Sequence, residues 1–530
     1  MTTVDAPRRG SGTALESWVG RAALVTGVMI AGGTALGFLR DLVMAHLFGA
    51  NSGTDAFLVG WTIPETVAPL LIEDAMALLM VPVVTQLLQR DSGVLPLVRH
   101  ILPRLVACLS LITVVLVVAA PALVHVLAPG LVDPDLAVRC VRLTALTVVT
   151  FGVAGFMSAT LRAHHRFGPP AAIYLAYNVG ILVCIASLAK AIGITSAAIG
   201  VACGGLLMVA VQARAFLGRL RAVPAAAGAG GDMRLAVAAV APIVVYTLTR
   251  QAQVFIERFF GSDLAAGSIS HLNYAQKVAQ VPMVLSVLIV TVTYPRLARD
   301  AANGDLALVA RRIQQNLVIV SAMVLCATAY LVAFAPAIIH VLFEHGRFTA
   351  ADAAGTAAIL RVYALGLWGQ AMVTLAVKAF FARGRPVWRP AAAVAIGLAV
   401  TATIAVVFTT AVGTVALAAA NAAGITCAAV LLLVGVRLWV APVSLRRIGV
   451  DVGRLLLIAA AAGAVGLRTA AALDHVGPAL VAPIAGFAVT TATFALLAVL
   501  TGRNLIAVLR RSSPLGAFWR RHRTDSGRDQ

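Results

Sequence analysis

The sequence predicts an all-α polytopic membrane protein of about 14 transmembrane helices, arranged as two six-helix lobes related by internal duplication plus two C-terminal helices. The clearest observation is a run from Ala391 to Val436 without one Asp, Glu, Lys or Arg, which is enough helix to cross a bilayer twice. In addition, 61% of the residues are hydrophobic and only 12% are charged. Such a composition excludes a soluble globular domain.

The hydrophobic runs, taken in chain order, give the expected spans. A cytoplasmic N-terminal tail (1–20) precedes an N-lobe (21–222), a C-lobe (234–438), a final helix pair (446–503) and a basic cytoplasmic tail (504–530). The predicted spans lie at about 21–45, 54–88, 102–129, 137–161, 169–190, 194–218, 234–260, 267–297, 312–343, 353–382, 388–411, 413–436, 447–468 and 478–502.

Basic residues alternate between loops and set the expected orientation. With the N-terminus inside, 30 Lys and Arg residues fall on the inner side and five on the outer side. The positive-inside rule therefore places both termini in the cytoplasm. The scarcity of Lys, three residues against 38 Arg, indicates a bacterial genome rich in G and C and hence a bacterial plasma membrane.

The net charge of +20 raises the question of a nucleic-acid partner, for which residues 510–528 are the best candidate segment. No binding motif accompanies these arginines. Inner-loop arginines are expected instead to contact anionic lipid headgroups, so we predict membrane lipids as partners and no nucleic acid.

An internal repeat supports the two-lobe architecture. The segment 121–127, Pro-Ala-Leu-Val-His-Val-Leu, reappears as Pro-Ala-Ile-Ile-His-Val-Leu at 336–342. Phe48-Gly49 matches Phe260-Gly261, and Pro170 matches Pro390, at similar offsets. An offset of six helices keeps both copies in the same orientation, which is the layout of transporters that bind substrate between two lobes.

No catalytic or metal site is predicted. The six cysteines are scattered without a CxxC pattern, the histidines lack partners at motif spacing, and no phosphate-binding loop is present. We therefore expect no enzyme, no cofactor and no metal.

Charged residues inside the predicted spans are the candidate site, because each costs about 2.5–3.5 kcal/mol at a helix centre. We predict that they line one polar chamber for an anionic substrate, since bases exceed acids in the second lobe and Arg grips phosphate oxygens bidentately. The alternative is a set of structural salt bridges, such as Arg40 with Asp74. The bases are Arg40, Arg250, Arg258, Lys277, Arg361 and Lys378, and the acids are Asp41, Asp55, Glu65, Glu73, Asp74 and Glu257.

Several motifs resemble the MurJ (MviN) family, the lipid II flippases of the MOP superfamily. The first two spans carry Gly37-Phe-Leu-Arg-Asp41, Phe48-Gly-Ala50, Gly53-Thr-Asp-Ala-Phe57, Ile63-Pro64, Glu73 and Val81-Pro82. The second lobe carries Leu342-Phe-Glu-His-Gly-Arg-Phe-Thr-Ala-Ala-Asp352, Tyr363-Ala-Leu-Gly366 and Lys378-Ala-Phe-Phe-Ala-Arg-Gly-Arg385. The likeness covers most of the chain.

The resemblance implies a fourteen-helix flippase that moves undecaprenyl-pyrophosphate-linked peptidoglycan precursor to the outer leaflet by alternating access. It implies lipid II as substrate and cell-wall synthesis proteins as candidate partners. Matched positions give Arg40, Asp55 and Glu73 as functional charges of the first lobe and Lys277 as the basic residue of the eighth span. With the unexpected charges Arg250, Glu257 and Arg258, these seven residues are the predicted substrate-binding set.

The sequence also departs from the family pattern. Thr34, Ala68 and Pro69 stand where the family has basic residues, Gln276 replaces an acid, and the eleventh span has no Asp for the sodium site of some members. These departures keep three alternatives open: a flippase for another polyprenyl-linked glycan, a MATE-type multidrug antiporter, which would lack the last pair of spans, and a non-transporting cell-wall scaffold. Gly33-xxx-Gly37 indicates a helix-packing face.

Overall fold

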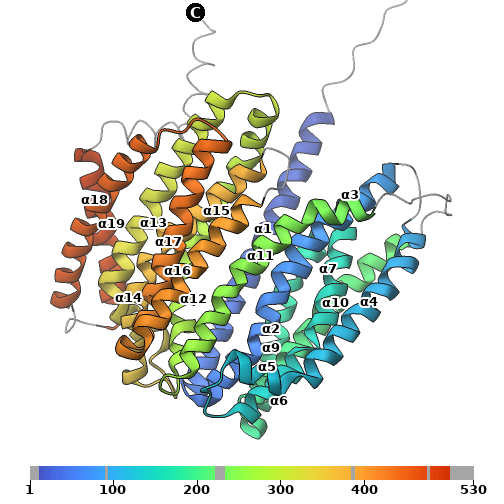
Figure 1. Cartoon of the computed structure of the whole chain (residues 1–530), viewed down its shortest axis with the longest axis horizontal. Coiled ribbons are helices and arrows are strands. Elements are labelled where there is room, and N and C mark those ends of the chain that lie inside the picture. The colour runs from blue at the N-terminus through green and yellow to red at the C-terminus, as the bar shows by residue number, and fades with distance from the viewer. Residues whose placement is uncertain (1–10, 90–93, 221–232, 383–387, 474–477, 502–530) are drawn as a thin grey trace, which may run out of the picture. The chain divides into compact units, whose positions relative to one another are not determined.

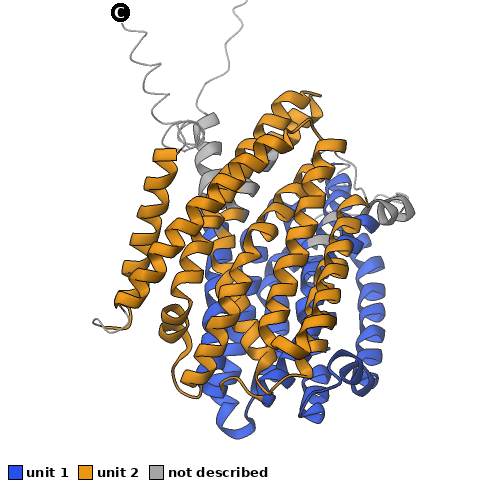
Figure 2. Ribbon diagram, turned by 60° about the vertical axis from the view of Figure 1, so that its left-hand side comes forward, with its two compact units in different colours: residues 1–48, 52–248 blue, residues 49–51, 249–530 orange. Residues whose placement is uncertain are grey.

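The computed structural model describes residues 11–89, 94–220, 233–382, 388–473 and 478–501, and within them the chain is helical without a strand (Figure 1). It forms two compact units. Unit 1 comprises residues 1–48 and 52–248, and unit 2 comprises residues 49–51 and 249–530 (Figure 2). The chain therefore passes from unit 1 to unit 2 for the last time between residues 248 and 249, inside one long helix.

The helices of unit 1 follow the predicted spans, and four of these spans are broken into shorter helices. The bounds are α1 Ser11–Phe48, α2 Ser52–Ala68, the π-helical turn η1 Pro69–Asp74, α3 Ala75–Gln89, α4 Leu95–Val118, α5 Ala120–Leu127, α6 Pro134–Thr144, α7 Thr147–Ala163, α8 Gly168–Ala171, α9 Ile173–Ile192 and α10 Thr195–Leu220.

The long helix α11, Met233–Ser262, belongs to both units, and unit 2 continues from its second half. The remaining bounds are α12 Ser268–Ala302, α13 Leu306–Phe343, α14 Ala350–Leu365, α15 Leu367–Phe381, α16 Arg389–Val412, α17 Thr414–Trp439, α18 Leu445–Leu473 and α19 Val481–Thr501. Helices α18 and α19 pack on α13 through a core that includes Leu325, Leu455 and Phe494.

The predicted membrane architecture is confirmed. Eleven segments of the described residues are long and apolar enough to cross a bilayer, and α14 with α15 adds a twelfth as a span bent by 42°. Helices α11 and α12, with 30 and 35 residues, are also long enough to cross a bilayer. Large apolar side chains on α4, such as Leu111 and Val118, are 65% and 73% exposed, as expected for a surface that faces lipid.

Matching glycines support the internal duplication. Gly193 ends α9 with φ 58° and ψ −140°, and Gly413 ends α16 with φ 71° and ψ −143°. A side chain is strained at this positive φ, so glycine is favoured at both turns. Each hairpin also contains a close glycine contact, Gly180 with Gly204 and Gly397 with Gly424. The pairs α9–α10 and α16–α17 are therefore equivalent elements of two repeats.

Candidate functional site

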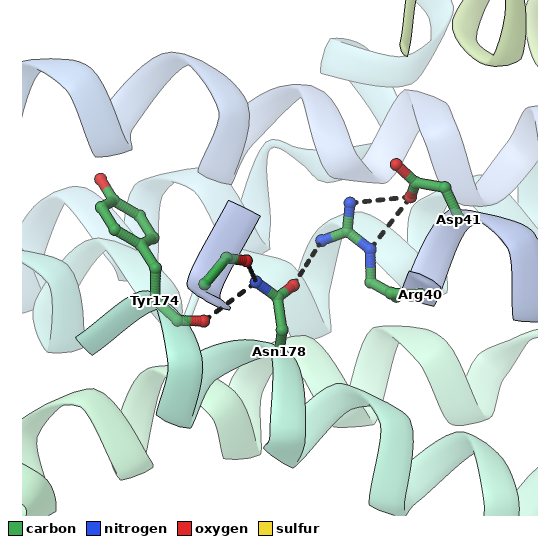
Figure 3. A network of polar contacts seen from close by, with 5 residues as sticks. Arg40, Asp41, Tyr174 and Asn178 are labelled. Atoms are coloured by element: carbon green, nitrogen blue, oxygen red, sulfur yellow. Dashed lines mark hydrogen bonds and ion pairs between the residues drawn. The ribbon is translucent and has the colours of Figure 1, made fainter. Parts of the chain in front are cut away.

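Arg40 lies on α1 and is buried in unit 1, where it makes three hydrogen bonds to side chains. Its Nε and Nη2 atoms donate to Oδ1 of Asp41 at 3.0 and 2.8 Å, and Nη1 donates to Oδ1 of Asn178 at 3.2 Å (Figure 3). The guanidinium carbon lies 4.3 Å from the ring centroid of Trp61, a cation–π contact. The neighbouring Asp41 pairs with Arg40. The side chain of Asp74, which the salt-bridge alternative named, lies outside the described residues.

Asn178 joins α9 to α1. Its Nδ2 atom donates to the carbonyl of Gly33 at 3.1 Å and to that of Tyr174 at 2.9 Å. The two helices approach closely here, because a methyl group added at Gly33 would lie 3.0 Å from Cβ of Tyr174 and one added at Gly37 would lie 3.4 Å from Nδ2 of Asn178. The Gly33-xxx-Gly37 pattern is thus confirmed as a helix-packing face.

Glu73 lies on the π-helical turn η1 of the second span. Pro69 begins this turn, and a proline inside a helix lacks an amide hydrogen and disrupts the regular i to i−4 pattern, which accounts for the wider turn. On the neighbouring α7, Gly155 accommodates η1, because a Cβ at that position would lie only 2.1 Å from the carbonyl oxygen of Leu71. The exposed carboxylate of Glu73 accepts a hydrogen bond from the Tyr174 hydroxyl at 2.6 Å.

In unit 2, Glu257 is the centre of a buried polar cluster. The side chain is 2% exposed, and its Oε1 atom accepts hydrogen bonds from Tyr363 Oη at 2.8 Å, Asn421 Nδ2 at 2.8 Å and Gln253 Nε2 at 3.2 Å. The donors come from α11, α14 and α17. Three donors on one oxygen are the arrangement that stabilises a buried carboxylate.

The other predicted site residues differ in exposure. Asp55 on α2 is 4% exposed and Arg258 on α11 is 2% exposed, so both are buried. Arg250 is exposed and Lys277 is half-buried. The structure therefore assembles two buried groups, one in each unit, around Arg40 and Glu257, while a single chamber that includes all seven residues stays a prediction.

Sequence reasoning missed the neutral residues of these groups. Trp61, Tyr174 and Asn178 surround the charges of unit 1, and Gln253 and Asn421 contribute to the cluster of unit 2. A signal was available, since Asn178 and Asn421 are each flanked by long apolar runs, where an amide requires a partner. Their partners lie far away in the sequence, and this signal does not identify them.

Eleven or more apolar spans among the described residues, duplicated hairpins and buried charged groups define the protein as a multi-pass membrane transporter of the two-lobed type. The family model "Lipid II flippase MurJ" matches residues 44–480, and the chain belongs to this family.

Curated relatives agree with this membership. The chain is 25% identical over 358 residues to the probable lipid II flippase MurJ of Buchnera aphidicola subsp. Acyrthosiphon pisum, covering 66% of this chain and 70% of that protein. It is also 25% identical over 365 residues to the lipid II flippase MurJ of Burkholderia cenocepacia, with the same coverage.

Among solved structures, the fold is similar to a lipid II flippase MurJ in the inward closed conformation, with a TM-score of 0.75, 19% identity and coverage of 91% of this chain and 100% of that one. It is also similar to an inward-facing multidrug resistance MATE family transporter of the MOP superfamily, with a TM-score of 0.62, 11% identity and coverage of 81% and 98%.

Proposed function

We propose that this protein is a flippase that moves lipid II, or a closely related polyprenyl-pyrophosphate glycolipid, from the cytoplasmic to the outer leaflet by alternating access. The observation that carries the proposal is the family match over residues 44–480, which includes most of both repeats. The last pair of helices, α18 and α19, favours this reading over a MATE-type antiporter, which would lack them.

The substrate class requires positive charge along its path, because a pyrophosphate diester is anionic. In unit 1 the charge of Arg40 is already met by Asp41. Arg250 on α11 is exposed, and Lys277 on α12 is half-buried within a predicted span. We therefore assign the anionic headgroup mainly to Arg250 and Lys277, with Arg258 and Glu257 shaping the local charge.

Orientation is part of the proposal. The bias of 30 inner against five outer basic residues supports cytoplasmic termini and loading from the cytoplasmic side. In this orientation the inner arginines also attract anionic lipid headgroups, and cell-wall synthesis proteins are proposed as partners that supply or consume the substrate.

The direct test is complementation of a bacterial strain depleted of its own lipid II flippase. We expect growth and the appearance of lipid II at the outer leaflet, measured with a lipid II-cleaving enzyme added from outside. Normal abundance in the membrane without lipid II at the outer leaflet would contradict the proposal and favour another polyprenyl-linked glycan or a scaffold role.

Lys277 is the sharpest single-residue test of the anion assignment. A lysine supplies a mobile point charge, so Lys277→Arg should retain binding of lipid II to the purified protein. Lys277→Ala should lower affinity roughly tenfold or more, corresponding to about 1–3 kcal/mol for a charged hydrogen bond. Unchanged affinity in Lys277→Ala would place the headgroup elsewhere.

A further inference from the structure

We propose that Tyr174 and Asn178, one turn apart on α9, are positioning residues that hold Glu73 and Arg40, the charges of the first lobe, in register for transport. The inference rests on the proposed function, since transport is the process these contacts would serve. It adds two neutral residues to the charged residues of the proposed site, and both act through hydrogen bonds within unit 1.

Residues four apart on a helix share one face, so Tyr174 and Asn178 form a single strip of α9. The Tyr174 hydroxyl donates to Oε1 of Glu73 at 2.6 Å, and Oδ1 of Asn178 accepts from Nη1 of Arg40 at 3.2 Å. The two residues also contact each other, because Nδ2 of Asn178 donates to the Tyr174 carbonyl at 2.9 Å (Figure 3). One strip of α9 thus links an acid on η1 to a base on α1.

The orientation of the Asn178 amide follows from its partners. Both contacts of Nδ2 are backbone carbonyls, those of Gly33 and Tyr174, and a carbonyl can only accept. The amide must therefore direct its NH₂ group to these carbonyls and its Oδ1 atom to the guanidinium of Arg40. Asn178 also lies against Gly37, so α1 and α9 are in close contact at the place where Arg40 is held.

Glu73 needs a positioning partner because its side chain is exposed on an irregular turn. Long exposed side chains keep several rotamers, and a short hydrogen bond to a carboxylate selects one of them. The Tyr174 hydroxyl makes this bond from a helix that is itself packed on α1. Rearrangement of η1 relative to α9 would have to break it, so the bond should affect the rate of conformational exchange more than substrate affinity.

The test compares two Tyr→Phe variants on the same helix. Tyr174→Phe removes the hydroxyl that bonds Glu73, while Tyr177→Phe removes a buried hydroxyl that has no hydrogen-bond partner among the described residues and keeps the ring packed on Phe151. We expect Tyr174→Phe to lower the rate of lipid II flipping roughly tenfold at unchanged lipid II affinity, an effect of about 1.4 kcal/mol. Tyr177→Phe should flip at the parental rate.

Asn178→Leu should likewise reduce the flipping rate more than the affinity for lipid II. Parental flipping by both Tyr174→Phe and Asn178→Leu would overturn the proposal. A loss of affinity in Tyr174→Phe as large as its loss of rate would also overturn it, because the residue would then act in binding.

A thermal double-mutant cycle tests the positioning contact without any transport. The melting temperature is measured for the parent, Tyr174→Phe, Glu73→Ala and the double variant. Because Tyr174 is proposed to act through Glu73, the double variant should melt no lower than the more damaging single variant. Additive shifts would overturn the positioning role. Should the parent move no lipid II, the proposed function fails, and this cycle still decides the positioning role separately.

Discussion

At the scale of single residues, the buried charges of Arg40 and Glu257 are balanced by neighbouring groups of the protein. Arg40 is 7% exposed, bonds Asp41 twice, bonds Asn178 once and stacks on Trp61. Glu257 is 2% exposed and is held by neutral donors. A buried charge remains in the protein only when it is paired or fully hydrogen-bonded, and both residues satisfy this rule.

Arg40→Ala should therefore lose stability as well as transport. Removing the base leaves Asp41 buried without its partner, which costs about 3–5 kcal/mol. The double variant Arg40→Ala/Asp41→Ala should recover most of the lost melting temperature while transport stays impaired. Thermal melting and membrane abundance of the two variants measure this, and a double variant that melts as low as Arg40→Ala would argue against the pair.

Asn421→Ala should destabilise unit 2, because Oε1 of Glu257 loses one of its three donors. The expected loss is about 1–3 kcal/mol for a buried hydrogen bond to a charged group. Thr403→Ala on α16 is the matched control, since Thr403 is exposed and bonds only its own helix at the Ala399 carbonyl, and it should change stability by less than about 0.5 kcal/mol. Equal melting temperatures for the two variants would contradict the importance of the cluster.

At the scale of elements, the second span is irregular. Its helix is interrupted by η1 between α2 and α3, and the span carries Pro64, Pro69 and Pro82. Local wide turns of this kind often coincide with functional sites, and here the turn presents Glu73 to Tyr174. The turn depends on Gly155 of α7, where no side chain fits beside Leu71.

Gly155→Ala should consequently disturb the packing of α7 on η1. The added methyl would lie 2.1 Å from a backbone oxygen, and overpacking of this kind costs about 1–3 kcal/mol. Gly218→Ala on α10 is the control, because nothing lies within 4 Å of its added methyl. Flipping and melting temperature should fall in Gly155→Ala and hold in Gly218→Ala, and an unaffected Gly155→Ala would show that η1 adapts freely.

At the scale of the whole molecule, two repeats and an additional helix pair form a multi-pass membrane protein. The repeats share their hairpin turns at Gly193 and Gly413. The bias of Lys and Arg between loops predicts the direction across the membrane, with both termini in the cytoplasm.

Topology is tested by cysteine labelling in a variant without its six native cysteines, of which Cys108 is exposed. We expect single cysteines at either terminus and at positions 383–389 to be protected from a membrane-impermeant reagent added outside, and one at Arg347 to react. The reverse pattern at either terminus would contradict the fourteen-span orientation.

The sequence by itself determined the membrane class, the many apolar spans, the duplication and the family resemblance, because these depend on local hydropathy and on residues close together in the chain. A long charge-free run such as 391–436 is stable as helices that span the membrane, because a helix satisfies its own backbone hydrogen bonds there. Only the tertiary structure decided which partners the charges have. Arg40 meets Asn178 across 138 positions, Glu73 meets Tyr174 across 101, and Glu257 meets Asn421 across 164. No periodic pattern in the sequence predicts contacts over such separations, because they depend on how apolar helices pack. Glycines such as Gly33 and Gly155 govern that packing, since they allow close approach to neighbouring helices.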